Sequence, residues 1–256
     1  MSRLVFVLLD GLAAATARRH MSYMAALTES GAARHTELLA ELPPLSRPLY
    51  ATLFTGLTPL ETGIVRNEDA RPAPAPTLFA RAREAGLTTA AAAYHWMSEL
   101  CNRTPFEPGR DRLCDDARLP ISHGLFYSED AYPDAELFRD AEALRVKFAP
   151  DLLLVHSMGI DFAGHAHGAG SRAYRQAVRA ADSLLADAIP RWLAWGATVM
   201  VTSDHGMDAD ASHADPSDAA RRVPFWLVGA PAEAPLPASQ THIAGLATRL
   251  LGLAPA

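Results

Sequence analysis

The sequence predicts an α/β sandwich whose central β-sheet is largely parallel. The first observation behind this prediction is an alternation of short apolar runs, typical of buried strands, with amphipathic segments, typical of helices. Such alternation indicates βα units, in which helices cover both faces of a sheet. The second observation is that Asp and His residues follow several of the apolar runs. Ligands of open α/β sheets bind outside the carboxyl ends of the strands, so these residues stand where a functional site is expected.

Apolar runs bounded by turn signals define the expected strands. The run from Leu4 to Leu9 is continuous, as in a central strand that is buried on both faces. It ends at Asp10-Gly11, a common turn dipeptide. The expected strands are residues 4–9, 35–42, 88–93, 151–156, 197–201 and 222–228.

Periodic segments between these runs define the expected helices. Gly31 and Gly86 each stand where a helix is expected to end. Pro48 suits the first turn of another helix, because the N–H that proline lacks would have no partner there. The expected helices are residues 21–32, the segment that starts near Ser46, and residues 76–85, 134–147, 171–194 and 239–251.

Residues 95–133 differ in composition from the rest of the chain. They are rich in Arg, Asp, Pro and aromatic residues and are weakly periodic. We interpret them as a small lid inserted into a single catalytic domain of residues 1–256, because so few apolar residues cannot form a core alone. Four of their aromatic residues are candidate surfaces for stacking a substrate's leaving group: Trp96, Phe126, Tyr127 and Tyr132.

Charge and hydropathy exclude some classes of partner. The formal net charge is −6, whereas a general binder of nucleic-acid polymers needs a basic face. No apolar stretch approaches the roughly 20 residues that span a bilayer, and the first residues do not form a signal peptide. We therefore expect a cytoplasmic protein without a membrane partner, with Cys101 and Cys114 as free thiols. The oligomeric state stays open.

Six residues are candidate metal ligands. Asp204 and His205 follow the apolar run at 197–201 after Thr202 and Ser203, and Asp10 follows the first run. The others are Asp161 and His165, which would share one face of a helix, and His213 in a polar loop. Asp and His together favour zinc or another borderline divalent ion.

Six ligands are too many for one tetrahedral ion and suit two. Two metal ions about 4 Å apart can bind both the attacking and the leaving oxygen of a phosphoryl group. Ser46 stands at the start of a helix, where it could cap the helix or serve as a nucleophile beside the positive end of the helix dipole. The chain has neither a Gly-rich phosphate loop nor a GxSxG elbow, which removes two common hydrolase types.

These residues give the chain a marked resemblance to the alkaline phosphatase superfamily, and within it to the nucleotide pyrophosphatase/phosphodiesterase branch. Each motif is weak alone, but six in the same order are specific. The motifs are Leu8-Leu9-Asp10-Gly11, Leu42-Pro43 through Ser46 to Thr55-Gly56-Leu57, Gly63-Ile64-Val65 to Asn67, Asp161-x-x-Gly164-His165, Ser203-Asp204-His205-Gly206-Met207, and His213 followed by Val223-Pro224.

The resemblance implies a three-layer sandwich and a role for each site residue. Its fold would be alkaline-phosphatase-like, with a small lid insert. One metal ion would be held by Asp10, Asp204 and His205, with Ser46 as nucleophile and further ligand. The other ion would be held by Asp161, His165 and His213. Asn67 would donate a hydrogen bond to a phosphoryl oxygen, and a covalent phospho-serine would form and be hydrolysed.

We therefore expect a two-metal phosphodiesterase or nucleotide pyrophosphatase that acts on a small phosphate ester, with zinc or manganese as the metal. The chain departs from this branch in three places: it has Ser46 where threonine is usual, Leu45 where a basic residue is frequent, and His242 where a helix usually begins with aspartate. His213 also stands closer behind His205 than is usual in the branch. The alternatives are a phosphomonoesterase, a sulfatase-like hydrolase, a phosphosugar mutase and a non-catalytic metal-binding protein.

Overall fold

The computed structural model describes residues 2–254 and confirms the α/β sandwich. Its single eight-stranded sheet is formed by β1 (Arg3–Leu9), β2 (Ala33–Leu39), β3 (Thr89–Tyr94), β4 (Leu113–Asp115), β5 (His123–Tyr127), β6 (Leu152–Ser157), β7 (Ala197–Thr202) and β8 (Arg222–Val228). The strand order is β2-β8-β7-β1-β6-β3-β5-β4. Strands β7, β1, β6, β3 and β5 run parallel, while β8 and β4 are antiparallel to their neighbours.

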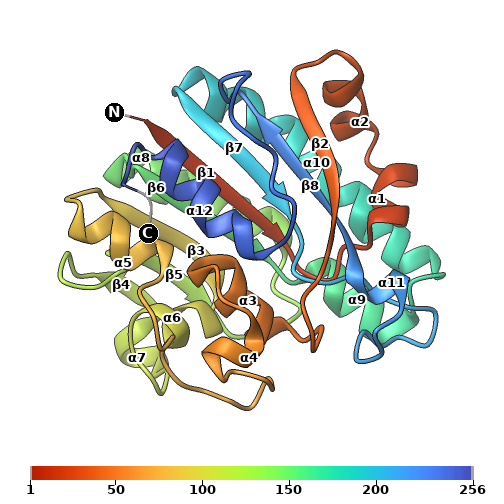
Figure 1. Cartoon of the computed structure of the whole chain (residues 1–256), viewed down its shortest axis with the longest axis horizontal. Coiled ribbons are helices and arrows are strands. Elements are labelled where there is room, and N and C mark those ends of the chain that lie inside the picture. The colour runs from red at the N-terminus through yellow and green to blue at the C-terminus, as the bar shows by residue number, and fades with distance from the viewer. Residues whose placement is uncertain (1, 255–256) are drawn as a thin grey trace.

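Helices cover both faces of the sheet, which makes three layers (Figure 1). One face is covered by α1 (Ala14–His20), α2 (Ser22–Glu29), α8 (Asp134–Phe148), α9 (Gly159–His167) and α10 (Arg172–Ala194). The other face is covered by α3 (Ser46–Thr55), α5 (Leu78–Glu84), α6 (Trp96–Cys101) and α12 (Thr241–Leu250). The short helices α4 (Pro59–Thr62), α7 (Pro108–Asp111) and α11 (Asp218–Arg221) lie in connections.

The alternation of side chains along β1 divides the core into two parts. Val5 and Val7 pack toward α10, together with its fully buried Trp192. Phe6 points to the opposite face and packs on Phe54 of α3, with ring centroids 5.5 Å apart. Both faces of β1 are therefore apolar, which explains why this strand appears as a continuous apolar run.

The parallel arrangement brings three strand ends together. β1 lies between β6 and β7, with Leu9 opposite Ser157 and Leu8 opposite Thr202. The backbone N–H of Asp10 donates to the carbonyl of Ser157 at 2.9 Å. The loops that follow β1, β6 and β7 consequently start side by side, at the edge where a ligand site is expected.

The structure corrects the interpretation of residues 95–133. This segment is not a separate lid, because β5 pairs in parallel with β3 and β4 pairs with β5. Phe126 and Tyr127 are buried in the core, so they cannot serve as stacking surfaces for a leaving group. The segment has few apolar residues because β5 and β4 lie at the margin of the sheet and β4 forms its edge.

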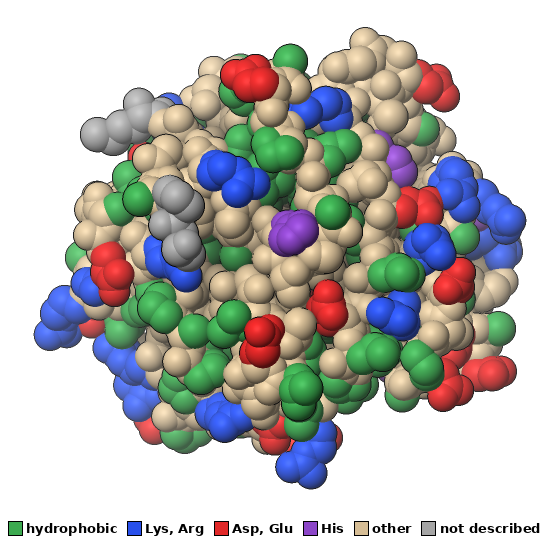
Figure 2. Space-filling model, in the orientation of Figure 1, with side chains coloured by type: hydrophobic (Ala, Val, Ile, Leu, Met, Phe, Trp, Pro, Cys, Tyr) green, Lys and Arg blue, Asp and Glu red, His purple; other side chains and the backbone are tan. Residues whose placement is uncertain are grey.

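The surface shows no clear preference for one sign of charge on the face in Figure 2, where basic and acidic side chains are interspersed. Within residues 2–254, no helix combines the length and the hydropathy needed to cross a bilayer.

Candidate metal centre and nucleophile

Three buried aspartates from three loops meet at the carboxyl edge of the sheet. Asp10 follows β1, Asp204 follows β7, and Asp161 lies in the first turn of α9 after β6. Asp10 and Asp204 are fully buried, and Asp161 is 5% exposed. One oxygen of each carboxylate is buried without a hydrogen-bond partner, namely Asp10 Oδ1, Asp161 Oδ1 and Asp204 Oδ2. Leaving such atoms unpaired is costly, so these carboxylates fit a bound cation.

Three histidines are oriented in the same way around these aspartates. The Nδ1 atom of His205 lies 2.9 Å from the carbonyl oxygen of Gly206, that of His213 lies 2.6 Å from Pro44 O, and that of His165 lies 3.0 Å from Ala211 O. A carbonyl oxygen only accepts, so each ring donates from Nδ1 and presents the lone pair of Nε2. This second hydrogen bond is typical of metal-ligating histidine.

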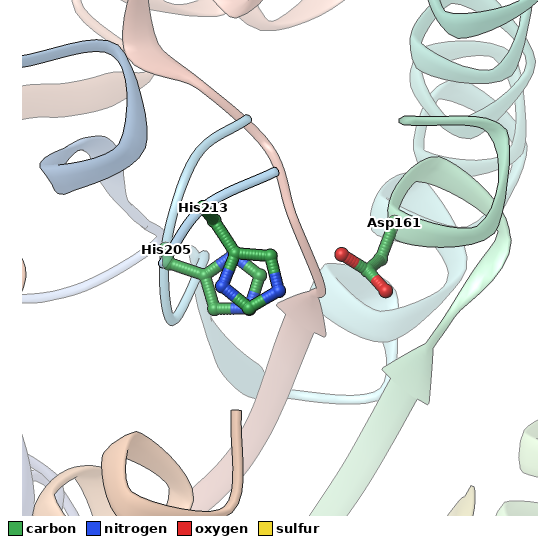
Figure 3. Close-up of side chains that lie close together, drawn as sticks. All are labelled: Asp161, His205 and His213. Carbon is green, nitrogen blue, oxygen red and sulfur yellow. The ribbon is translucent and has the colours of Figure 1, made fainter. Parts of the chain in front are cut away.

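The ligand atoms form two groups. Oxygen and nitrogen atoms of Asp10, Asp204 and His205 lie within 4.8 Å of one another, and so do those of Asp161, His205 and His213. His205 therefore belongs to both groups, and its ring stacks on His213 with centroids 3.6 Å apart. Figure 3 shows the Asp161 carboxylate directed toward these two rings from the opposite side.

His165 lies at the rim of the second group. Its Nε2 is 3.1 Å from His213 Nε2 and 3.5 Å from Asp161 Oδ2, and its side chain is 47% exposed. Two nitrogen lone pairs facing each other at this distance fit a shared cation. The structure thus places all six sequence-predicted ligands together, whereas His242 is exposed on α12 and belongs to neither group.

Close packing at the site depends on a glycine. Gly11 has a left-handed backbone with φ of 71°. A Cβ atom at this position would lie 2.8 Å from Asp161 Cα and 2.9 Å from its Oδ1. Only glycine lets the loop after β1 approach α9 this closely.

Electrostatics also indicate that the site lacks positive charge. Burial, together with the nearby Asp204 and Asp161 carboxylates, raises the pKa of Asp10 well above its usual value. Burial and Asp204 likewise raise the pKa of Asp161, and burial raises that of Asp204 to about 6. Burial lowers the pKa of His205 and of His213 to about 3, so both rings are neutral at pH 7.

These shifts predict that divalent metal binds more weakly at lower pH. Only the ionised carboxylate binds metal, and raised pKa values mean that protons compete with metal for Asp10, Asp161 and Asp204 as the pH falls toward 6. We expect the dissociation constant for Zn²⁺ to rise by about tenfold or more between pH 8 and pH 6. Calorimetric titration of chelator-treated protein at the two pH values measures it, and equal affinities would contradict the prediction.

Ser46 is the first residue of α3 and does not cap it. The N-cap residue is Leu45, and the helix has no side-chain cap. The Ser46 hydroxyl instead lies 3.0 Å from Nε2 of His205, the histidine shared by both groups. The capping interpretation of Ser46 is therefore wrong, and its oxygen stands at the positive end of the α3 dipole among the candidate ligands.

Asn67 lies beside the start of α3. Its side-chain Oδ1 accepts a hydrogen bond from the backbone N–H of Arg47 at 3.0 Å. Its backbone carbonyl accepts one from Arg47 Nε at 2.7 Å. Because Oδ1 is occupied by a donor, the free part of the side chain is its NH₂ group. That orientation leaves the Asn67 NH₂ group able to donate a hydrogen bond.

Several residues that support the site were not expected from the sequence. Tyr50 of α3 and His156 of β6 both donate to Asp10 Oδ2, the latter from Nε2 at 3.3 Å. Gln240 donates from Nε2 to the carbonyl of Asp204 at 2.5 Å. One signal was available for His156, because a polar residue within an apolar strand needs a buried partner. Tyr50 and Gln240 carry no such local signal.

A three-layer α/β sandwich with a buried serine beside two Asp/His groups at its strand ends is typical of the alkaline phosphatase superfamily. A profile of the type I phosphodiesterase / nucleotide pyrophosphatase family matches residues 4–218. The match covers most of the chain, so the protein belongs to this family of hydrolases. A sequence comparison with curated proteins finds no significant match.

Solved structures share the fold at low sequence identity. Murine ectonucleotide pyrophosphatase / phosphodiesterase 5 aligns with a TM-score of 0.73 and 13% identity, over 100% of this chain and 96% of that chain. The C-terminal periplasmic domain of EcEptC from Escherichia coli aligns with a TM-score of 0.70 and 12% identity, over 99% of this chain and 83% of that chain. The 2-O GAG sulfatase BT1596 aligns with a TM-score of 0.62 and 15% identity, over 99% of this chain and 71% of that chain.

Proposed function

We propose that the protein is a two-metal phosphodiesterase that cleaves small phosphodiesters or nucleotide pyrophosphates through a covalent phospho-serine. The observation that carries this proposal is the place of the Ser46 hydroxyl, 3.0 Å from the histidine shared by both ligand groups. An oxygen at that point can approach phosphorus while its negative charge is stabilised by the start of α3.

The proposed metal ligands are those that the structure brings together. Asp10, Asp204 and His205 would hold one ion, with Ser46 as a further ligand. Asp161, His165 and His213 would hold the other, with His205 adjacent. Two bound ions, zinc or manganese, would supply positive charge to the oxygens of the transferred phosphoryl group.

The protein's own groups carry the two chemical steps. In the first step, Ser46 Oγ loses its proton and forms a bond to phosphorus, while the bond to the leaving oxygen breaks and the leaving group departs as an oxyanion that takes up a proton from water. The NH₂ group of Asn67 donates to a phosphoryl oxygen, which keeps the group oriented. In the second step, water attacks the phospho-serine, which releases a phosphate monoester and regenerates Ser46.

A nucleotide is the first substrate type to test. The murine relative has been solved as an inactive variant, in which alanine replaces a threonine, in complex with AMP. Of the aromatic residues expected to stack on a leaving group, Trp96 and Tyr132 remain partly exposed. The Cζ atom of Arg47 lies over the Trp96 ring, 4.4 Å from the ring centroid. Because Arg47 is the second residue of α3, Trp96 lies next to the helix that begins with Ser46.

The test compares kcat/KM for bis-p-nitrophenyl phosphate, p-nitrophenyl phosphate and p-nitrophenyl sulfate at one pH with saturating metal. We expect the diester to be preferred over the monoester by about tenfold or more, because Asn67 is neutral and suits a singly charged group. A similar preference for the monoester would reject the diesterase and indicate a phosphomonoesterase. Preference for the sulfate would indicate a sulfatase, and no turnover would indicate a metal-binding protein.

A further inference from the structure

A buried ion pair involves Arg47, the residue that follows Ser46 in α3. Arg47 contacts Glu99 of α6 with its Nη2 atom 2.8 Å from Glu99 Oε2. The side chains are 3% and 9% exposed, so water screens their charges little. Glu99 also accepts the backbone N–H of Phe106 at 3.1 Å. The pair is thus fixed on both sides rather than mobile at the surface.

Arg47 also contacts Asn67, the residue proposed to donate a hydrogen bond to a phosphoryl oxygen. Its backbone N–H and its Nε both hydrogen-bond to Asn67. The guanidinium is therefore held against Asn67, the residue that would contact substrate. A cation so close and so little screened would favour a dianionic monoester over a singly charged diester.

We propose that Glu99 determines substrate specificity by neutralising Arg47. A guanidinium stays protonated at all ordinary pH values, so its charge can be cancelled only by a partner. With the Glu99 carboxylate paired to it, the two side chains add no net charge beside Ser46, and the site favours diesters. This inference rests on the proposed phosphodiesterase function and extends it to a residue that does not touch substrate.

A different arrangement would give the opposite result. Arg47 Nη1 is buried and has no hydrogen-bond partner. If that atom binds a phosphoryl oxygen directly, the paired Arg47 already assists monoesters, and its removal would weaken them selectively. Our proposal instead assigns the effect to the charge balance of the pair.

The first experiment is Glu99→Gln, assayed as the ratio of kcat/KM for p-nitrophenyl phosphate to that for bis-p-nitrophenyl phosphate. Glutamine keeps the size of the side chain and removes its charge, so we expect the ratio to rise by about tenfold. Glu99→Asp, which keeps the charge, is the matched control, with a ratio within about threefold of the parent. A general loss of folding lowers both activities and leaves their ratio unchanged.

The second experiment is the double variant Arg47→Met with Glu99→Gln. It is again neutral, so we expect the ratio to return to within about threefold of the parent, although both rates will fall. A ratio about tenfold below the parent would overturn the proposal and show that Arg47 binds the monoester. An unchanged ratio in a Glu99→Gln variant that is folded, as thermal unfolding shows, would also overturn it.

Two further outcomes are decisive. If Glu99→Gln does not fold, Glu99→Ala takes its place, because it also removes the carboxylate charge and leaves room for water to hydrate the unpaired guanidinium. The same rise of about tenfold in the ratio is expected, and an unchanged ratio overturns the proposal. If the parent enzyme turns over neither ester, the proposed function fails and this inference fails with it. A parent that turns over diesters, with variant ratios that do not move, rejects only the inference.

Discussion

Ser46→Ala is expected to lower kcat/KM for a phosphodiester by about a thousandfold or more, while the thermal midpoint stays nearly unchanged. The hydroxyl forms no helix cap, so its removal costs α3 no capping bond, and the hydrogen bond lost is the one to His205 Nε2 at 3.0 Å. The covalent step, however, has no other nucleophile at this position. Steady-state kinetics with bis-p-nitrophenyl phosphate, together with thermal unfolding, measures both quantities.

Ser98→Ala is a suitable matched control for this variant. Ser98 is also a buried serine on a helix, 1% exposed compared with 4% for Ser46, and among the described residues its hydroxyl forms no hydrogen bond to a candidate ligand. We expect its activity to match that of the parent. If Ser46→Ala stays within about tenfold of the parent, Ser46 is not the nucleophile and the phospho-serine mechanism is wrong.

The sheet was largely predictable because its central strands are apolar on both faces. β1, β6 and β7 lie between two helical layers, so their side chains form unbroken apolar runs. Each of the runs at 4–9, 88–93, 151–156, 197–201 and 222–228 is a strand in the structure, with ends that differ by at most one residue. The approximate position of the site followed from the same pattern, since Asp10 and Asp204 end adjacent strands.

The marginal parts of the sheet were not predictable in the same way. β5 contains His123 and Gly124, and β4 has only three residues, so neither gives a clear apolar run. Their pairing with β3 depends on contacts across the sheet that no local pattern encodes. The helix α1 was also not expected, because its sequence of alanines, arginines and a histidine has little apolar periodicity.

The grouping of the ligands depended on the fold of a loop. The resemblance implied separate sets of three, but the structure places His205 in both tight groups. His213 reaches His205 because its loop is folded on Asp208, whose Oδ1 accepts the backbone N–H groups of Asp210 and Ser212. Spacing along the chain cannot show that two rings will stack at 3.6 Å.

Removal of metal is expected to abolish phosphodiester turnover and to lower the thermal midpoint by about 5–10 °C. A ligand that binds only the folded state at a hundredfold excess over its dissociation constant adds about 2.7 kcal/mol, and a chain of this size gains about 2–4 °C for each kcal/mol. The three carboxylate oxygens that are buried without partners lose their counter-charge when the ions leave. Chelator treatment followed by thermal unfolding and a diester assay measures both effects.

Readdition of metal tests the number of ions as well as their necessity. Elemental analysis of protein purified without chelator should give two divalent ions per chain, because the aspartates and histidines form two groups that share only His205. Zn²⁺ and Mn²⁺ are added back separately to the chelated protein, with Mg²⁺ as the control, since the mixed Asp and His ligands disfavour an ion that prefers oxygen alone. Full activity with one ion or none would reject the two-metal site. Ser46 would then act as the nucleophile without a second metal ion.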